Sequence, residues 1–293
     1  MNPMFSQQIV AGNVSPVVVD WVNRVQKNGG AKPSQNTIVA VNDFYHNIAS
    51  TTILGKVKSL NCYVPDNVIA AITPLINTVG RDPWLNNNNQ FVAADLTING
   101  LKGNGSDQFN TSVVKFLDTG VSGSNYSNDN TAGLTVYAYT TGLSADAGTY
   151  EAGYTNDDGS DGASISFHDN NANIFRFWAF NLNNGGCLFS STGSGYLSGN
   201  RISSTDMRMY FANASIAHSQ VAINTGLNTG ARAAHNIFVH AVYHWNAGGL
   251  VTFGASPSRL SFAAIHDGLT SNESGQFFSF IQAYRQQIGG GWV

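Results

Sequence analysis

The sequence predicts a mainly β protein, a two-sheet β-sandwich preceded by a small α-helical N-terminal region. Glycine, with 31 residues, and asparagine are abundant, and both tolerate the positive φ angles of tight turns. From Phe91 onward, short apolar segments alternate with turn residues, as in sandwiches and barrels. Within residues 134–139 and 174–179, apolar and polar side chains alternate with a period of two, which is typical of strands with one buried face.

The N-terminal region has helix signals. Ser15 is a suitable N-cap, Pro16 suits the first helical position, and Gly29-Gly30 ends the segment. Ser34 begins a second predicted helix. The apolar faces of the two helices are formed by Val18, Trp21, Val22 and Val25, and by Ile38, Val41, Tyr45 and Ile48.

Two shorter segments complete this helical lead. Residues 53–60 are apolar and fit either a helix or a strand. Asp66 is the expected cap of a short helix that Pro74 ends. The composition changes at Asp82-Pro83-Trp84 and the asparagine run that follows. We therefore expect a lead for docking or oligomerisation at residues 1–85 and a sandwich with a capping helix at 86–293.

Nine strands are expected in the second region, because alternating segments are separated there by Gly, Asn and Ser turns. Many strands at this spacing predict two packed sheets. No internal repeat is visible. The predicted strands are residues 112–117, 133–141, 149–154, 163–168, 174–180, 207–211, 219–223, 237–245 and 259–265.

A capping box begins the last predicted helix. Thr270 can accept a hydrogen bond from the backbone N–H of Glu273, whose side chain can accept one from the N–H of Thr270. Gly289 to Gly291 end the helix. Its apolar face, predicted to lie on the sandwich, is formed by Phe277, Phe280, Ile281, Tyr284 and Ile288.

Composition excludes several classes of partner. Charged residues make up only 11% of the chain and its net charge is −3, so no strongly basic face for nucleic acid is expected. No apolar run approaches the ~20 residues of a membrane span, and Met1 to Val10 lack the features of a signal peptide. Cys62 and Cys187 are expected to be free buried thiols, with one disulfide as the alternative.

A strand, a G-L-T-x-x-E motif and an amphipathic helix follow one another from Arg259 through Thr270 and Glu273. This order resembles the end of concanavalin A-like (laminin G-like) jelly-roll domains. Residues 207–214, Met-Arg-Met-Tyr-Phe-Ala-Asn-Ala, resemble the x-x-Y-x-N-G hairpin of these domains. Ala214 departs from the family pattern, which has glycine at this turn position.

Upstream segments are similar to one subgroup of these proteins. They are Trp21-Val-Asn-Arg-Val, Asn28-Gly-Gly, Gly100-Leu-Lys-Gly-Asn-Gly and Leu117-Asp-Thr-Gly-Val. That subgroup occurs in tailed bacteriophages and some bacterial genomes and carries a short helical lead. The resemblance implies a non-enzymatic structural or adhesion protein of the virion, such as a tail, fibre or capsid-decoration component. Its expected partners are other virion proteins and sister subunits.

Glutamate content argues against hydrolysis of sugars, which needs two carboxyl groups at a set distance. The chain has two glutamates, Glu151 and Glu273, and the E-x-D-x-x-E motif of the family's glycosidase branch is absent. Glu273 is explained by the capping box, and Glu151 is expected on a solvated strand. We therefore predict no catalytic residues. A glycan-degrading hydrolase that uses aspartates stays open as the alternative.

Oxygen ligands gather in residues 156–162, where Asp157, Asp158 and Asp161 are the candidate ligands of a Ca²⁺ ion. The spacing does not match an EF-hand, and a turn with Asx hydrogen bonds is the alternative. His240 and His244 share one face of a predicted strand but lie ~13 Å apart, too far to bind one metal ion. No resident cofactor is therefore expected.

Aromatic side chains are the candidates for binding host surface glycans, because flat amphipathic rings stack on sugars when they are exposed. Core packing is the alternative for each of them. The three candidate carbohydrate-binding residues are Tyr154, Trp178 and Trp245. Further aromatic residues that could stack on sugars are Tyr126, Tyr196 and Tyr243.

Overall fold

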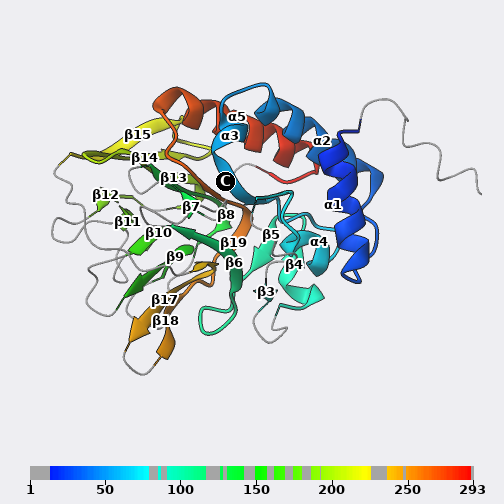
Figure 1. Cartoon of the computed structure of the whole chain (residues 1–293), viewed down its shortest axis with the longest axis horizontal. Helices are drawn as coiled ribbons and strands as arrows, with labels where there is room; N and C mark the ends of the chain where they lie inside the picture. The colour runs from blue at the N-terminus through cyan, green and yellow to red at the C-terminus, as the bar shows by residue number, and fades with distance from the viewer. Residues whose placement is uncertain are drawn as a thin grey trace, which may run out of the picture.

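Three layers build the protein: a layer of helices, a first β-sheet (sheet A) and a second β-sheet (sheet B) (Figure 1). The fold is mainly β, as predicted, and its two sheets are almost entirely antiparallel. The computed structural model describes residues 14–78, 85–86, 91–116, 126–127, 131–141, 149–156, 162–168, 174–179, 186–191, 193–225, 236–246 and 249–291.

Sheet A contains nine strands among the described residues, in the order β15-β14-β13-β8-β19-β1-β2, with β5 on β19 and β4 on β5. Its members are β1 (Val57–Asn61), β2 (Ile76–Asn77), β4 (Leu96–Thr97), β5 (Gly100–Lys102), β8 (Ala132–Thr140), β13 (Gly195–Ser203), β14 (Asp206–Ala212), β15 (Ser219–Asn224) and β19 (Arg259–His266).

Sheet B contains ten strands in the described part of the chain. Its main path is β12-β11-β10-β9-β16-β6-β3, while β17 pairs with β9 and β18, and β7 with β6. Its members are β3 (Leu85–Asn86), β6 (Asn110–Phe116), β7 (Tyr126–Ser127), β9 (Ala152–Asn156), β10 (Gly162–Ser166), β11 (Ile174–Ala179), β12 (Cys187–Ser190), β16 (Asn236–Val239), β17 (Ala241–Asn246) and β18 (Gly249–Ala255).

The helix layer follows the capping signals of the sequence. The Ser15 side chain accepts a hydrogen bond from Val17 N at the start of the first helix, and Ser34 caps the second. Thr270 and Glu273 form the predicted capping box of the last. The helices are α1 (Pro16–Lys27), α2 (Gln35–Ala49), α3 (Ile53–Lys56), α4 (Val68–Ile72) and α5 (Ser271–Gln287), with a 3₁₀ turn, η3 (Ala93–Asp95).

One predicted cap is wrong. Asn67, not Asp66, caps α4, because the Asn67 side chain accepts a hydrogen bond from Ala70 N at 2.9 Å. Asp66 instead binds the start of α2, where its carboxylate accepts hydrogen bonds from Ser34 N and the Thr37 hydroxyl. Asp66 therefore stabilises the positive N-terminal end of a different helix.

Two hydrophobic cores lie on the two faces of sheet A. In β8, Leu134 and Val136 face sheet B, whereas Tyr137 faces α2 and α5. The expectation of strands with one buried face is wrong here, because the helix layer covers the outer face of the sheet. On α5, Phe277 and Tyr284 are buried in the helix–sheet core, as the helical spacing predicted.

The N-terminal lead belongs to the same layers. The ambiguous segment 53–60 forms α3 and then β1, which lies between β19 and β2 in sheet A. Trp21 of α1 and Ile38 of α2 are buried in the helix–sheet core. These two side chains are therefore not available for self-association. The division of the chain at residue 85 stays a prediction.

The turn after β14 forms without glycine. The Asn213 side-chain Oδ1 accepts hydrogen bonds from Ser215 N at 2.9 Å and Ile216 N at 2.8 Å, and Asn213 N donates to Ile216 O. This Asx turn is formed by asparagine. Ala214 is consequently tolerated at the position where the sequence resemblance implied glycine.

Candidate functional site

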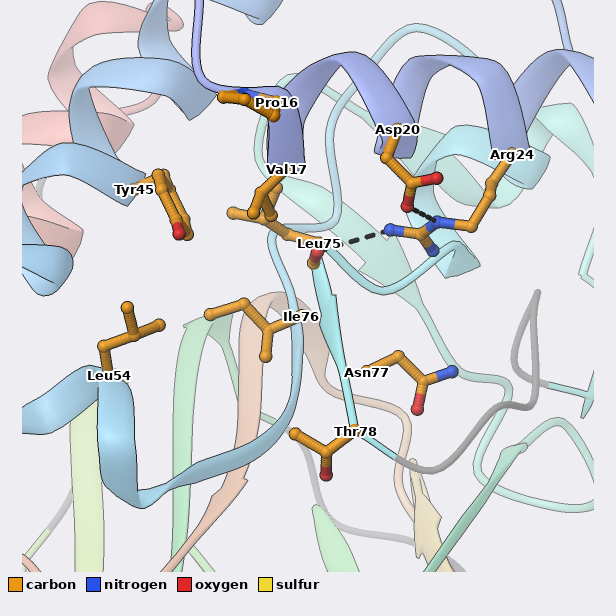
Figure 2. Close-up of a pocket in the computed structure, with 10 residues that line it drawn as sticks. All are labelled: Pro16, Val17, Asp20, Arg24, Tyr45, Leu54, Leu75, Ile76, Asn77 and Thr78. Carbon is orange, nitrogen blue, oxygen red and sulfur yellow. Dashed lines mark hydrogen bonds and ion pairs between the residues drawn. The ribbon is translucent and has the colours of Figure 1, made fainter. Parts of the chain in front are cut away.

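A groove of ≈ 580 Å³ opens between α1, the α2–α3 region and β2. Figure 2 shows Tyr45 and Leu54 on one side of it and Val17 and Ile76 on the other. Its lining is mainly apolar. The lining residues are Pro16, Val17, Asp20, Arg24, Tyr45, Leu54, Leu75, Ile76, Asn77 and Thr78.

Three side chains of α1 fix the shape of the groove. Trp21 Nε1 donates to Thr73 O at 3.0 Å, and the Arg24 guanidinium donates to Pro74 O at 2.9 Å and Leu75 O at 3.3 Å. Arg24 also pairs with Asp20, with 2.7 Å between Nε and Oδ2. The bonds of Trp21 and Arg24 to residues 73–75 join the helix to the segment that leads into β2 and so hold these two walls of the groove together.

The groove has the chemistry of a binding site. Its ten lining residues include no histidine, cysteine, serine, lysine or glutamate. Its ion pair is already satisfied, since Arg24 is held by Asp20 and two backbone carbonyls. The lining groups that could take part in catalysis are Asp20, Tyr45 and Thr78, and the Asp20 carboxylate is paired with Arg24. The lining therefore suits apolar side chains of a ligand.

Glu151 is the clearest correction to the sequence interpretation. It was expected to be solvated, but its exposed fraction is 0%. Its Oε1 accepts hydrogen bonds from the Ser256 and Ser258 hydroxyls at 2.9 and 2.8 Å, and its Oε2 accepts one from Phe167 N at 2.8 Å. Residues 256–258 connect β18 of sheet B to β19 of sheet A. Glu151 thus anchors the crossover between the sheets.

His240 lies beside this cluster in the left-handed region of backbone space, with φ of 67°. His240 N donates to Glu151 O, and Ser256 N donates to His240 O. The predicted strand 237–245 is therefore interrupted at His240, between β16 and β17. Burial raises the pKa of Glu151 to about 7, although its three hydrogen bonds act to lower it. Burial lowers the pKa of His240 to about 4.

Glu273 has a structural role as well. Its carboxylate accepts hydrogen bonds from Thr270 N, the Thr52 hydroxyl and Lys56 Nζ at 2.8, 2.6 and 2.6 Å. Burial acts to raise the pKa of Glu273, but these donors outweigh it and lower the pKa to about 2. The carboxylate therefore joins the start of α5 to α3, beyond its predicted role in the cap.

The candidate carbohydrate-binding aromatics are not at the surface where the structure describes them. Tyr154 of β9 is fully buried in the core between the sheets, and Trp178 of β11 is 7% exposed. Neither ring is accessible to a sugar, so their positions agree with core packing. Trp245 belongs to β17, but its side chain lies outside the described residues.

The candidate metal ligands Asp157, Asp158 and Asp161 also lie outside the described residues. Within the described ranges, no group of three or more His, Cys, Asp or Glu side chains could hold a metal ion. Cys62 and Cys187 are free and buried, as expected, and burial raises the pKa of both thiols. No described helix has the length and apolar character that a membrane span requires.

The sequence interpretation missed the groove and the Glu151 cluster. Residues from three separate segments line the groove, so no local pattern marks it. The sequence pattern places Tyr45 on the apolar face of a helix, and only the structure shows that it is half-buried. For Glu151, the paired serines Ser256 and Ser258 lie more than a hundred positions away in the chain, which conceals the contact.

No protein-family model matches the chain, and no curated protein matches it. Among solved structures, the chain is similar to domain 4 of AbnA, a GH43 extracellular arabinanase from Geobacillus stearothermophilus, in complex with arabinotriose. The match has 12% identity and a TM-score of 0.40, and covers 76% of this chain and 98% of that chain.

Proposed function

We propose that this protein is a non-enzymatic structural and adhesion protein of a bacteriophage virion. The observation that carries the non-enzymatic part is the use of both glutamates by the fold. Glu151 anchors the crossover between the sheets, and Glu273 caps α5 and binds Lys56. A retaining or inverting glycosidase needs two carboxyl groups that face a sugar across a cleft. These two carboxylates are instead occupied by hydrogen-bond donors of the protein.

The structural part of the proposal is supported by the resemblance to phage jelly-roll proteins and by the three-layer architecture. The central strands of sheet A are buried on both faces, and the described lead shares its core. Few charged side chains and many amides and hydroxyls suit wide polar contacts with neighbouring subunits. We propose sister subunits and other virion proteins as the partners and the virion as the location.

Mass spectrometry of purified phage particles tests this role. The expected result is the chain at a fixed stoichiometry in intact virions. Its absence from particles whose genome encodes it would overturn the proposal. Hydrolysis of a bacterial polysaccharide by the wild type, lost in a folded Asp158→Ala variant, would replace it by the glycan-degrading hydrolase.

Adhesion is proposed to occur through host surface glycans. Support comes from the polar, amide-rich composition, since the buried Tyr154 and Trp178 do not offer stacking surfaces. The test is a glycan array probed with the protein multimerised on beads, because avidity reveals weak sites. Binding that is competed by the free glycan supports adhesion. No binding at high subunit density would remove the adhesive function and leave the structural one.

A further inference from the structure

The groove of Figure 2 exposes apolar side chains that a partner could cover. Val17, Tyr45 and Leu54 are half-buried, and Leu75 and Ile76 also line the groove. Removing such surface from water is favourable by roughly 25 cal/mol per Å². An occupant with apolar side chains and no charge would therefore bind best.

A segment of the chain itself has these properties. Residues 1–13 read Met-Asn-Pro-Met-Phe-Ser-Gln-Gln-Ile-Val-Ala-Gly-Asn and contain no charged side chain. The described chain begins at Val14, and Pro16 and Val17 already line the groove. Thirteen residues reach at most roughly 45 Å when extended. The segment thus starts at the edge of the groove and is long enough to cross it.

The contacts of Arg24 define how such a segment can bind. Its guanidinium already donates hydrogen bonds to the carbonyl oxygens of Pro74 and Leu75, the two residues before β2. Insertion of side chains into the groove is therefore favoured over addition of a strand. An uncharged occupant also leaves the Asp20–Arg24 ion pair intact, whereas a charged peptide would compete for it.

We propose that residues 1–13 dock in the groove of their own chain, with Phe5, Ile9 and Val10 against Val17 and Leu54. The segment covers the apolar lining between α1 and α3. The groove is then an intramolecular docking site for the N-terminal segment. This inference is independent of whether the protein belongs to a phage particle.

Distance measurements between two spin labels on the full-length protein test the proposal. The labels are placed at Ser6→Cys and at the exposed Thr78→Cys on the rim of the groove; Cys62 and Cys187 are buried. The expected result is one short, narrow distance distribution. It must persist when a large excess of unlabelled protein is added. A broad distribution overturns the proposal, and a distance lost on dilution overturns it in favour of exchange between two copies.

Matched variants separate docking from general effects. Leu54→Asp places a charge in the groove and is expected to broaden the distribution. Val19→Asp, at a residue that is 46% exposed on α1 and does not line this groove, is expected to leave it unchanged. Phe5→Ser with Ile9→Ser removes the proposed apolar contacts without altering the described fold, and must also broaden the distribution. A narrow distribution in both the Leu54→Asp and the Phe5→Ser/Ile9→Ser proteins would refute docking.

Discussion

Glu151 and Glu273 lie in two regions that shift the pKa of a glutamate in opposite directions. Glu151 lies inside the sandwich, where burial is the main influence and raises the pKa of its carboxyl group to about 7. Glu273 lies at the start of α5, where Lys56, Thr52 and Thr270 lower the pKa to about 2. Both carboxylates accept three or more hydrogen bonds. The difference in pKa therefore comes from the burial of Glu151 and from the cation beside Glu273.

The two glutamates are stabilised by different kinds of partner. A carboxyl group at the edge of the fold is stabilised by a cation and by the N-terminus of a helix. One inside the fold must be enclosed by donors, and the two serines and the Phe167 amide supply them. Each serine hydroxyl can also accept a hydrogen bond, so the cluster accommodates the protonated acid. The following predictions separate the two cases.

The largest effect is expected for Glu151→Ala. The substitution leaves two buried hydroxyls and one buried amide without their acceptor, and each unpaired group costs about 1–3 kcal/mol. We expect the free energy of unfolding to fall by about 4 kcal/mol, measured by urea denaturation at pH 5. Ser215, exposed in the turn after β14, provides a control, because Ser215→Ala lies outside the cluster. A loss below about 1 kcal/mol would contradict the anchoring role of Glu151.

The next effect is a dependence of stability on pH that belongs to Glu151. Its ordinary pKa of 4.5 is raised to about 7 in the fold, so between these values the unfolded chain has lost a proton that the native state keeps. The stabilisation is complete below about pH 4.5 and is lost as the pH rises through 7. We expect the stability of the wild type, relative to Glu151→Gln, to fall by about 3 kcal/mol across this range.

The variant must be subtracted, because two histidines act in the opposite direction. Burial lowers the pKa of His240 and His266 to about 4, so both destabilise the fold as the pH falls from 6.5 toward 4. Their contributions cancel in the difference between wild type and Glu151→Gln. A difference that stays constant from pH 4.5 to 7 would show that the Glu151 carboxyl titrates normally.

Features that depend on neighbouring residues were predictable from the sequence. Ser15, Ser34 and Thr270 cap the helices to which they were assigned, because an N-cap acts within one turn. The strand at β8 was expected one residue away from its observed bounds. The caps are local hydrogen bonds and the strand is a local periodicity, and both are present in the folded protein.

Features that depend on distant residues were not predictable. β13 was missed, although it lies in the centre of sheet A, because its sequence is rich in Gly, Ser and Asn. Gly199 is required there since a Cβ atom would collide with the ring of Phe177 from sheet B. Asn200 is buried because its side chain accepts a hydrogen bond from Leu269 N. The need for glycine at 199 and asparagine at 200 comes from partners that are distant in the sequence. The same is true of the contacts of Glu151 and of the lining of the groove.

A smaller effect is expected for Glu273→Ala. The substitution removes the acceptor of Thr270 N and the ion pair with Lys56, and the loss of a helix cap typically costs about 1–2 kcal/mol. The pKa of Glu273 is lowered from 4.5 to about 2, so its stabilisation is present above pH 4.5 and disappears as the pH falls through 2. Chemical denaturation at several pH values should therefore show the opposite trend to Glu151. A cost that grows as the pH falls would contradict the comparison.

The smallest effect is expected for Lys56→Met, which removes the cation that acts on Glu273. Lys56 Nζ lies 2.6 Å from Glu273 Oε2, but its side chain is 29% exposed, so the pair contributes about 0.5 kcal/mol and less at high salt. The more sensitive measurement is the pKa of Glu273 by NMR, which should rise toward 4.5. Lys58→Met is the matched control, because Lys58 pairs with Asp267 at 3.0 Å and should leave that pKa unchanged. If the pKa of Glu273 stays near 2 without Lys56, the hydroxyl and amide donors alone hold the charge. The contrast with Glu151 would then rest on burial rather than on the cation.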